Sequence, residues 1–221
     1  MRQRNLINFV VVMLCVGASP KVSANLILNG GFESGTPDPS RTRYGQVTRV
    51  PAGATDIDEW EVYCGAVDYF FEDFWELGIE SRYVDLHVEN GEIGGIRQLI
   101  PTVIGETYVL TFDVSGIDLT SYGGWAGGQI KYMHVQAGDY DDYVTYVSSP
   151  PEQWGGWETR EILFEASSEF TWVSFGGNQR TEDQGNAGMW LDNISVVLIP
   201  EPTTLLLLGL GAVMVRRRRK R

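Results

Sequence analysis

The sequence contains little cysteine and histidine, and this limits the chemistry that the chain can perform. Its two cysteines are Cys15 and Cys64, and Cys15 lies inside an apolar run near the N-terminus. Removal of that run leaves Cys64 alone, which excludes an internal disulfide. The two histidines, His87 and His134, form no cluster with the spacing of metal ligands, and no Gly-x-Ser-x-Gly elbow is present. We therefore expect no catalytic residues, and a glycosidase that uses two carboxylates stays as an alternative.

Basic residues are scarce in the body of the chain. The whole chain has 17 Lys and Arg against 29 Asp and Glu, for a formal net charge of −12. Nine of the basic residues lie before Asn25 or after Val215, whereas every acidic residue except Glu201 lies within Asn25–Pro200. The body therefore carries a charge close to −20. Such a charge repels nucleic acid and anionic lipid, and it favours solubility and cations such as calcium.

The N-terminus has the layout of a secretory signal peptide. Arg2 and Arg4 precede an apolar run from Phe9 to Val16, and Val22-Ser23-Ala24 supplies small residues for cleavage. Cleavage after Ala24 makes Asn25 the first mature residue. A buried N-terminal helix is the alternative, but the arginines directly before the apolar run favour the signal peptide. We expect residues 1–24 to direct export through the Sec translocon and then to be removed.

The C-terminus joins three pieces: Pro200-Glu201-Pro202, an apolar stretch from Thr203 to Val215, and a basic run from Arg216 to Arg221. As a helix the apolar stretch spans roughly 20 Å, which is less than the roughly 30 Å hydrocarbon core of a membrane. The basic run stays in the cytoplasm, and the two prolines leave an extended backbone that a protease can reach. The stretch therefore suits a transient insertion into the inner membrane better than a lasting anchor.

This combination resembles the PEP-CTERM sorting signal. The resemblance implies a Gram-negative bacterium that makes extracellular polysaccharide, and cleavage near Pro200, Glu201 and Pro202 by an exosortase, a membrane enzyme similar to a cysteine transpeptidase. We expect three parts: a signal peptide at 1–24, one domain at 25–199 and a sorting signal at 200–221. The domain then works at the cell surface or outside the cell.

Short alternating segments, separated by glycine-rich connections, fill the body. Residues 108, 110, 112 and 114 share one face of a predicted strand, and Phe170 and Trp172 lie opposite Val173 and Phe175 on another. Further strands are predicted at 130–135, 162–164 and 194–198. This pattern predicts an all-β fold, a β-sandwich and most simply a jelly roll. We interpret Gly35–Ala54 as a long surface loop, and Phe71–Leu77 as either a helical turn or a loop.

Several motifs make the assignment of a family possible. They include Asn25-Leu-Ile-Leu-Asn-Gly-Gly-Phe-Glu33, Gly94-Gly-Ile-Arg-Gln98 and Leu191-Asp192-Asn193. Their order and spacing resemble the choice-of-anchor C family and its plant relatives, which are cell-wall proteins, over nearly all of residues 25–198. The resemblance implies a galactose-binding-like jelly roll. It also implies non-catalytic binding to polysaccharide of the matrix or of the cell envelope.

A structural calcium ion is the candidate cofactor. In carbohydrate-binding jelly rolls that open with a similar motif, a cation joins the first and last strands, and Glu33 and Asp192 occupy the matching positions. Calcium takes several oxygen ligands at about 2.3–2.6 Å, and Asn29 and Asn193 are further candidates. The alternative is that Glu33 and Asp192 bond to turn amides and the asparagines cap turns.

Aromatic residues are the candidate sugar platform, because flat rings stack on the apolar faces of sugars. The sequence has 7 Trp and 10 Tyr. We expect Trp60 and Trp172 to lie in the core, and we expect the platform residues among the tryptophans near glycine-rich or acidic loops, Trp75, Trp125, Trp154 and Trp157. Packing under a loop is the alternative for each of them. The acidic run 139–143 is interpreted as a solvated hairpin tip.

The sequence thus predicts a surface-sorted β-sandwich that binds polysaccharide through loop aromatics, without nucleic acid as a partner. Two other hypotheses remain: a structural protein of a biofilm matrix with no specific glycan ligand, and a glycoside hydrolase.

Overall fold

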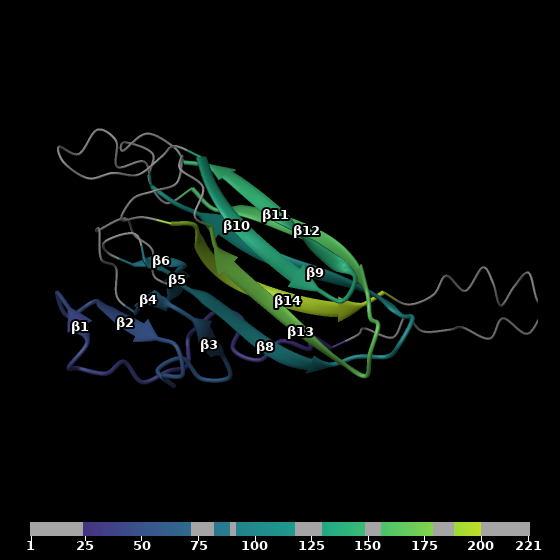
Figure 1. Cartoon of the computed structure of the whole chain (residues 1–221), viewed down its shortest axis with the longest axis horizontal. Helices are drawn as coiled ribbons and strands as arrows, with labels where there is room; N and C mark the ends of the chain where they lie inside the picture. Colours follow the sequence, from purple (N-terminus) through teal and green to yellow (C-terminus); the bar gives the residue numbers. More distant parts are fainter. Residues whose placement is uncertain are drawn as a thin grey trace, which may run out of the picture. The chain divides into compact units, whose positions relative to one another are not determined.

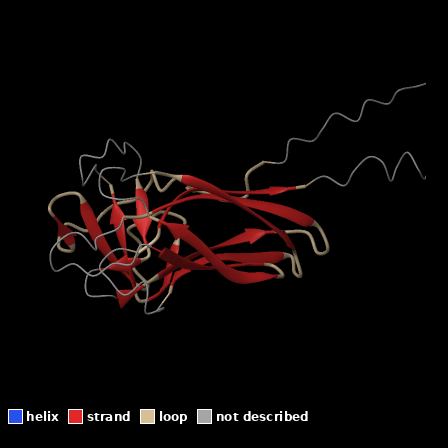
Figure 2. Cartoon of the chain, turned by 90° about the horizontal axis from the view of Figure 1, so that it is seen from above, coloured by secondary structure: helices blue, strands red, loops and turns tan. Residues whose placement is uncertain are grey.

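The computed structural model describes residues 24–71, 82–88, 92–117, 130–148, 156–178 and 188–199 (Figure 1). Every regular element in these ranges is a β-strand, drawn red in Figure 2. The strands are β1 Thr42–Arg43, β2 Val47–Pro51, β3 Glu61–Cys64, β4 Ala66–Phe70, β5 Tyr83–Asp85, β6 His87–Val88, β7 Glu92–Ile93, β8 Gly95–Pro101, β9 Thr107–Ser115, β10 Ile130–Ala137, β11 Tyr140–Val147, β12 Glu158–Glu165, β13 Phe170–Gly177 and β14 Trp190–Leu198.

Two large antiparallel sheets form the fold, and β6 and β7 pair as a separate two-stranded sheet. The seven-stranded sheet has the order β1-β2-β4-β5-β14-β9-β12, and the five-stranded sheet has the order β11-β10-β13-β8-β3. The chain passes from one of these sheets to the other after β2, β3, β8, β9, β11, β12 and β13, and from β5 to β8 by way of β6 and β7, so that strands distant in sequence lie side by side. This repeated crossing is the connectivity of a jelly roll. The predicted all-β sandwich is therefore confirmed.

The core lies between the sheets and follows from the period-two pattern of the strands. Along β9, the side chains of Tyr108, Leu110, Phe112 and Val114 are all buried, as the alternation predicts. The ring of Phe112 meets that of Phe175 edge-on, with centroids 5.2 Å apart, and this contact joins the two sheets. One apolar cluster runs through the described part of the sandwich.

Two expectations about local structure are wrong. Gly35–Ala54 is not a continuous loop, because β1 and β2 form a hairpin inside it, with Thr42 opposite Thr48. Trp172 is not in the core: the alternation along β13 turns it outward with Phe170, and 42% of its surface is exposed. Trp60 is in the core as predicted, with 5% of its surface exposed and its ring 5.4 Å from that of Phe32.

Candidate functional site

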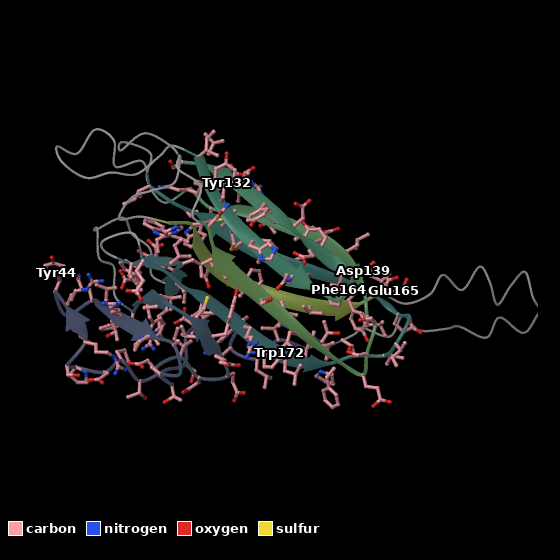
Figure 3. The ribbon with its side chains drawn as sticks, in the orientation of Figure 1. Tyr44, Tyr132, Asp139, Phe164, Glu165 and Trp172 are labelled. Carbon is pink, nitrogen blue, oxygen red and sulfur yellow. The ribbon has the colours of Figure 1, made fainter. Side chains whose placement is uncertain are left out.

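The outward side of the five-stranded sheet, called the outer face below, carries exposed ring and apolar side chains. Phe170 and Trp172 on β13 lie opposite Pro101 and Leu99 on β8. Phe170 is 59% exposed and Leu99 is 46% exposed, and Figure 3 places Trp172 over β8 and β13. Clustered apolar groups that remain uncovered on a soluble domain indicate a surface that binds something.

Arg97 lies at the centre of the outer face, and its contacts hold its side chain in one geometry. Its Nε and Nη2 atoms donate to the two carboxylate oxygens of Glu61 on β3, each at 2.9 Å. The guanidinium carbon lies 4.2 Å from the ring centre of Trp172 and 5.3 Å from that of Tyr63. The hydrogen bonds from Arg97 lower the pKa of Glu61, and those to Glu61 raise the pKa of Arg97. The fixed guanidinium therefore orients the neighbouring rings.

Tyr63 lies flat on the sheet because two glycines leave space for it. A Cβ atom on Gly95 would lie 2.6 Å from the tyrosine ring, and one on Gly176 would lie 2.9 Å from its hydroxyl. Gly95 and Gly176 are cross-strand partners on β8 and β13. Burial raises the pKa of the Tyr63 hydroxyl to about 12. The phenol therefore stays neutral and can act as donor and acceptor.

The row of rings continues across the sheet. His134 on β10 pairs with Gly176, and Tyr143 on β11 pairs with His134. The His134 and Tyr143 rings have centroids 5.0 Å apart, and His134 Nε2 lies 2.6 Å from an oxygen of Asp141. Tyr63, His134 and Tyr143 thus lie on one level of the face, across successive strands.

A shallow groove of about 260 Å³ adjoins Trp172. Gln98 shapes its edge by accepting a hydrogen bond from the Leu28 amide and donating to the carbonyls of Leu28 and Glu59. The backbone of Glu59 has a φ of 68°, which is rare for a residue with a side chain. The groove therefore combines apolar walls with a few polar groups at fixed positions, and its lining residues are Leu26, Leu28, Glu59, Glu61, Arg97, Gln98, Leu99, Pro101 and Trp172.

Only one of the four loop tryptophans predicted to form the sugar platform lies among the described residues. Trp75, Trp125 and Trp154 lie outside the described residues. Trp157 is half-buried, and its ring packs edge-on against Tyr83 at 5.9 Å and against Trp190 at 6.4 Å, away from the outer face. Sequence reasoning missed Tyr63, Arg97 and Trp172. The alternation along residues 170–175 was the signal that separates Trp172 from the core.

The predicted calcium ligands lie near one another only in part. Around the space beside Gly31 lie an oxygen of Asp192, the side-chain oxygen of Asn193 and the Cγ atom of Glu33, at 3.6 to 3.9 Å from a Cβ built on the glycine. One Asp192 oxygen accepts from the Asn193 amide, and Glu33 accepts from the Arg82 amide. Within the described residues, no group of three or more His, Cys, Asp or Glu side chains is placed to hold a metal.

The fourth predicted ligand, Asn29, has its own partners. Its side-chain oxygen accepts from the Ser34 amide, and its nitrogen donates to the carbonyls of Ser34 and Asp58. Asn29 also has a φ of 49° and therefore closes a turn. This is the turn-capping alternative for Asn29, and calcium binding at Glu33 and Asp192 stays a prediction.

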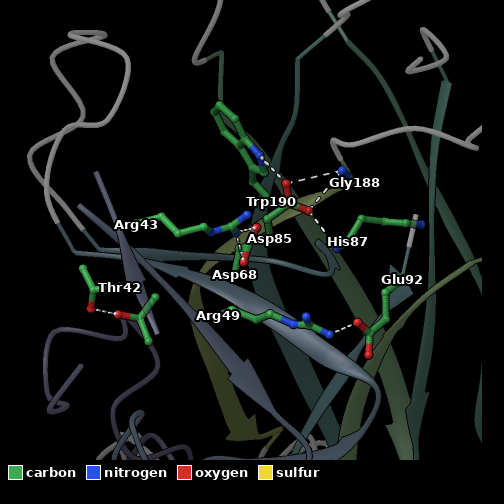
Figure 4. A network of polar contacts seen from close by, with 10 residues as sticks. Thr42, Arg43, Arg49, Asp68, Asp85, His87, Glu92, Gly188 and Trp190 are labelled. Carbon is green, nitrogen blue, oxygen red and sulfur yellow. Dashed lines mark hydrogen bonds and ion pairs between the residues drawn. The ribbon is translucent and has the colours of Figure 1, made fainter. Parts of the chain in front are cut away.

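A second polar cluster is buried elsewhere in the described part, around Asp85 and His87 (Figure 4). The carboxylate of Asp85 accepts from the amides of His87 and Gly188 and from the indole nitrogen of Trp190. Burial raises the pKa of Asp85 and lowers the pKa of His87 to about 4. Asp85 and His87 are 4% and 2% exposed, and the equally buried Lys131 lies near both of them. These groups are closed to a polymer and belong to the framework of the domain.

The two processing sites lie at the margins of the described part. Asn25, the predicted first mature residue, accepts hydrogen bonds from the amides of Ile27 and Val196. Pro200, Glu201 and Pro202, and the predicted membrane helix after them, lie outside the described residues. In the part of the chain that is described, we find no helix of the length and apolar character needed to cross a membrane.

Comparisons with solved structures give weak likenesses. A structure of a CBM4 is 14% identical with a TM-score of 0.38, and the match covers 78% of this chain and 99% of the other. TmCBM61 in complex with β-1,4-galactotriose is 16% identical with a TM-score of 0.40, covering 80% and 100%. Arabinose-bound MgGH51 α-L-arabinofuranosidase is 11% identical with a TM-score of 0.48, covering 80% of this chain and 27% of the enzyme. No curated protein matches the chain significantly.

Two family models match the sequence itself. Residues 198–220 match the PEP-CTERM protein-sorting motif, which confirms the predicted resemblance and indicates export and sorting to the cell surface. Residues 25–197 match the model described as "Protein of unknown function (DUF642)", the family that contains the plant cell-wall relatives. The chain therefore belongs to the DUF642 family and ends in a PEP-CTERM sorting motif.

Proposed function

We propose that this exported protein binds polysaccharide of the extracellular matrix or cell envelope on the outer face, without catalysis. The observation that carries the proposal is the exposed indole of Trp172, which stacks with an Arg97 guanidinium that Glu61 holds in place. Sugars offer apolar C–H faces to flat rings and hydroxyls to charged or amide groups. The groove beside Trp172 is lined both by a flat ring and by charged and amide side chains.

The charge on this surface favours a neutral glycan. Arg97 is neutralised by its pairing with Glu61, while Glu59 also lines the groove and Asp141 lies further along the outer face. A polymer rich in uronic acids meets more carboxylates than cations here, and like charges repel. We therefore infer that a neutral polymer binds more tightly than an acidic polymer of the same backbone length.

An affinity panel with the purified body, residues 25–199, tests this function. The panel contains neutral β-linked galactan, xylan and glucan, a polygalacturonate, and the neutral and acidic polysaccharides of the producing cells. We expect saturable binding to at least one neutral polymer and weaker binding to polygalacturonate at low salt. Absence of binding across the panel favours the structural matrix protein instead. Release of reducing sugar from any polymer contradicts the non-catalytic assignment.

Processing is the second part of the proposal. We infer cleavage after Ala24, transient insertion of residues 203–215 into the inner membrane, and cleavage near residues 200–202 by an exosortase. Mass spectrometry of the ends of the native protein tests each step. An intact C-terminus in cells that contain an exosortase contradicts the sorting pathway.

A further inference from the structure

The end of the sandwich at which β8 and β14 finish lies beside both the beginning and the end of the mature domain. The arrowheads of both strands point to this end in Figure 1. The Ile199 amide donates to the Thr107 carbonyl at 2.9 Å, which fixes the last described residue to the start of β9. Leu26 also donates to Val196 here. The beginning and the end of the mature domain therefore meet at the same place.

Little chain separates this end from the sorting segment. The sorting motif matches residues 198–220, and its apolar stretch begins at Thr203 after Pro200-Glu201-Pro202. From Ile199 to Thr203 the chain advances by four residues, which span at most about 14 Å when extended. While the apolar stretch is inserted in a membrane, Ile199 therefore lies within about 14 Å of the lipid interface, whatever the domain binds elsewhere.

This same end exposes apolar side chains. Val103 and Ile104, in the turn between β8 and β9, are 57% and 61% exposed, and Phe170 and Ile199 are 59% and 36% exposed. Hydrogen bonds hold the turn in place, because Val103 donates to the Tyr108 hydroxyl and Gly105 donates to the Ala166 carbonyl, both at 2.8 Å. The side chains of Val103 and Ile104 at the tip of this turn are therefore exposed and do not pack into the apolar core.

The charge at this end of the domain determines which kind of lipid surface it can contact. The carboxylates near the turn belong to Glu106, Glu165 and Glu169. They repel an anionic membrane, whereas a zwitterionic headgroup layer accepts apolar side chains without that repulsion. The chemistry therefore matches a lipid surface of low net charge.

We propose that the β8–β9 turn, with Val103 and Ile104 at its tip, rests in the headgroup region of the inner membrane while the sorting segment is inserted; this inference rests on the insertion of residues 203–215 proposed above. The contact orients the domain with residues 200–202 at the membrane surface, where a membrane protease cleaves. It ends when cleavage releases the domain. This role is separate from glycan binding, because the outer-face residues Tyr63, Arg97 and Trp172 take no part in it.

The test uses the chain without its predicted signal peptide, residues 25–221, in phosphatidylcholine nanodiscs that hold one chain each. Cys64→Ser provides a background for a fluorescent label at Ser167→Cys, beside the turn, or at Tyr44→Cys. Tyr44 is 75% exposed, and Figure 3 shows it at the opposite end of the fold from Glu165. Nitroxide lipids labelled near the headgroup quench only fluorophores close to the interface. We expect stronger quenching at position 167 than at position 44, because a tether of about 14 Å keeps this end of the domain near the interface.

A double variant distinguishes the apolar contact of the turn with lipid from simple tethering of the domain by the sorting segment. Val103→Ser with Ile104→Ser keeps the tether, and we expect it to reduce quenching at position 167 by about half or more, because the apolar contact is lost. The matched control is Ile130→Ser with Val147→Ser, an exposed cross-strand pair elsewhere on the fold. It leaves quenching unchanged.

Two outcomes overturn the proposal: equal quenching at both positions, or quenching that the double variant does not alter. Failure of this chain to enter the nanodiscs overturns the proposed insertion of residues 203–215, and the lipid contact of the turn falls with it. If quenching at position 167 appears only when a disc holds several chains, the turn contacts another copy of the chain. That result also overturns the proposed contact with lipid. Replacing part of the lipid with phosphatidylglycerol should weaken quenching at position 167, since the three glutamates face the same charge. An increase contradicts the assigned surface.

Discussion

Acid should destabilise the domain through His87, because this side chain is buried in its neutral form. His87 is 2% exposed, and its Nε2 atom lies 3.1 Å from the carbonyl oxygen of Asn178. In the described part, its Nδ1 atom has no hydrogen-bond partner, and a Cβ atom on Gly188 would lie only 2.1 Å from it. Burial first, and then the charge of Lys131, lower the pKa of His87 from 6.5 to about 4. Among the described residues, a proton on Nδ1 therefore finds no acceptor, and burial keeps it from solvent.

The size and sign of the effect follow from linkage. A histidine whose pKa is lowered by folding contributes stability that is fully present above pH 6.5 and is lost as the pH falls toward 4. One pKa unit corresponds to about 1.4 kcal/mol, so that the whole interval amounts to about 3 kcal/mol. The raised pKa of the buried Asp85 acts in the opposite direction. A comparison between variants is therefore needed to isolate His87.

Urea unfolding of the body, residues 25–199, at pH 7, 6, 5 and 4 measures the effect. We compare the wild type with His87→Gln, which removes the titrating group and keeps the backbone bond from residue 87 to Asp85. The wild type should lose up to about 3 kcal/mol more than the variant between pH 7 and pH 4. His134→Gln is the matched control, because His134 lies on the outer face and its loss should leave the effect of His87 in place. Parallel pH profiles for the wild type and His87→Gln would refute the reasoning.

The remaining predictions concern the outer face and calcium. Gly95→Ala should displace the Tyr63 ring, because its new Cβ would lie 2.6 Å from ring atoms, and glycan affinity should fall several-fold while melting changes little; unchanged affinity argues against a role for Tyr63. Glu61→Gln should release Arg97 from its paired hydrogen bonds, weaken neutral glycan binding and improve polygalacturonate binding, and a fall for both polymers contradicts the charge argument. Millimolar calcium should raise the melting temperature of the body, and Asp192→Ala should abolish the rise; no shift across this range refutes the calcium site.

The fold could be predicted from the sequence because it depends on local alternation. Tyr108, Leu110, Phe112 and Val114 alternate with polar residues, and an antiparallel sheet with one buried face imposes that period. The hairpin of β1 and β2 escaped prediction since its strands are short and lie among Gly, Pro, Ser and Thr. Its order comes from contacts distant in sequence, such as the pair of hydrogen bonds from Arg43 to Asp68.

The candidate site was harder to predict than the fold. From the sequence we expect Trp172 in the core, although the alternation places it with Phe170 and opposite Val173 and Phe175, and the structure turns it outward. Tyr63 carries no local signal, and Arg97 lies in the motif Gly94–Gln98, which identifies the family but does not indicate a binding role. They meet Trp172 only because β3, β8 and β13 are neighbours in the sheet, and this order depends on the whole topology. Sequence motifs therefore identified the family, while the binding surface required the three-dimensional arrangement.

Calorimetric titration of a neutral glycan from the panel into the wild type and Trp172→Ala tests the central claim most directly. About 100 Å² of Trp172 is exposed if the side chain presents roughly 250 Å² in full, and a sugar that covers half of it gains about 1 to 2 kcal/mol. The account predicts saturable binding to the wild type and a Kd that is roughly 5 to 30 times higher for Trp172→Ala. Tyr44→Ala, which removes an exposed ring far from the outer face, should bind like the wild type. Equal affinity of the wild type and Trp172→Ala would contradict the outer face as the glycan-binding site.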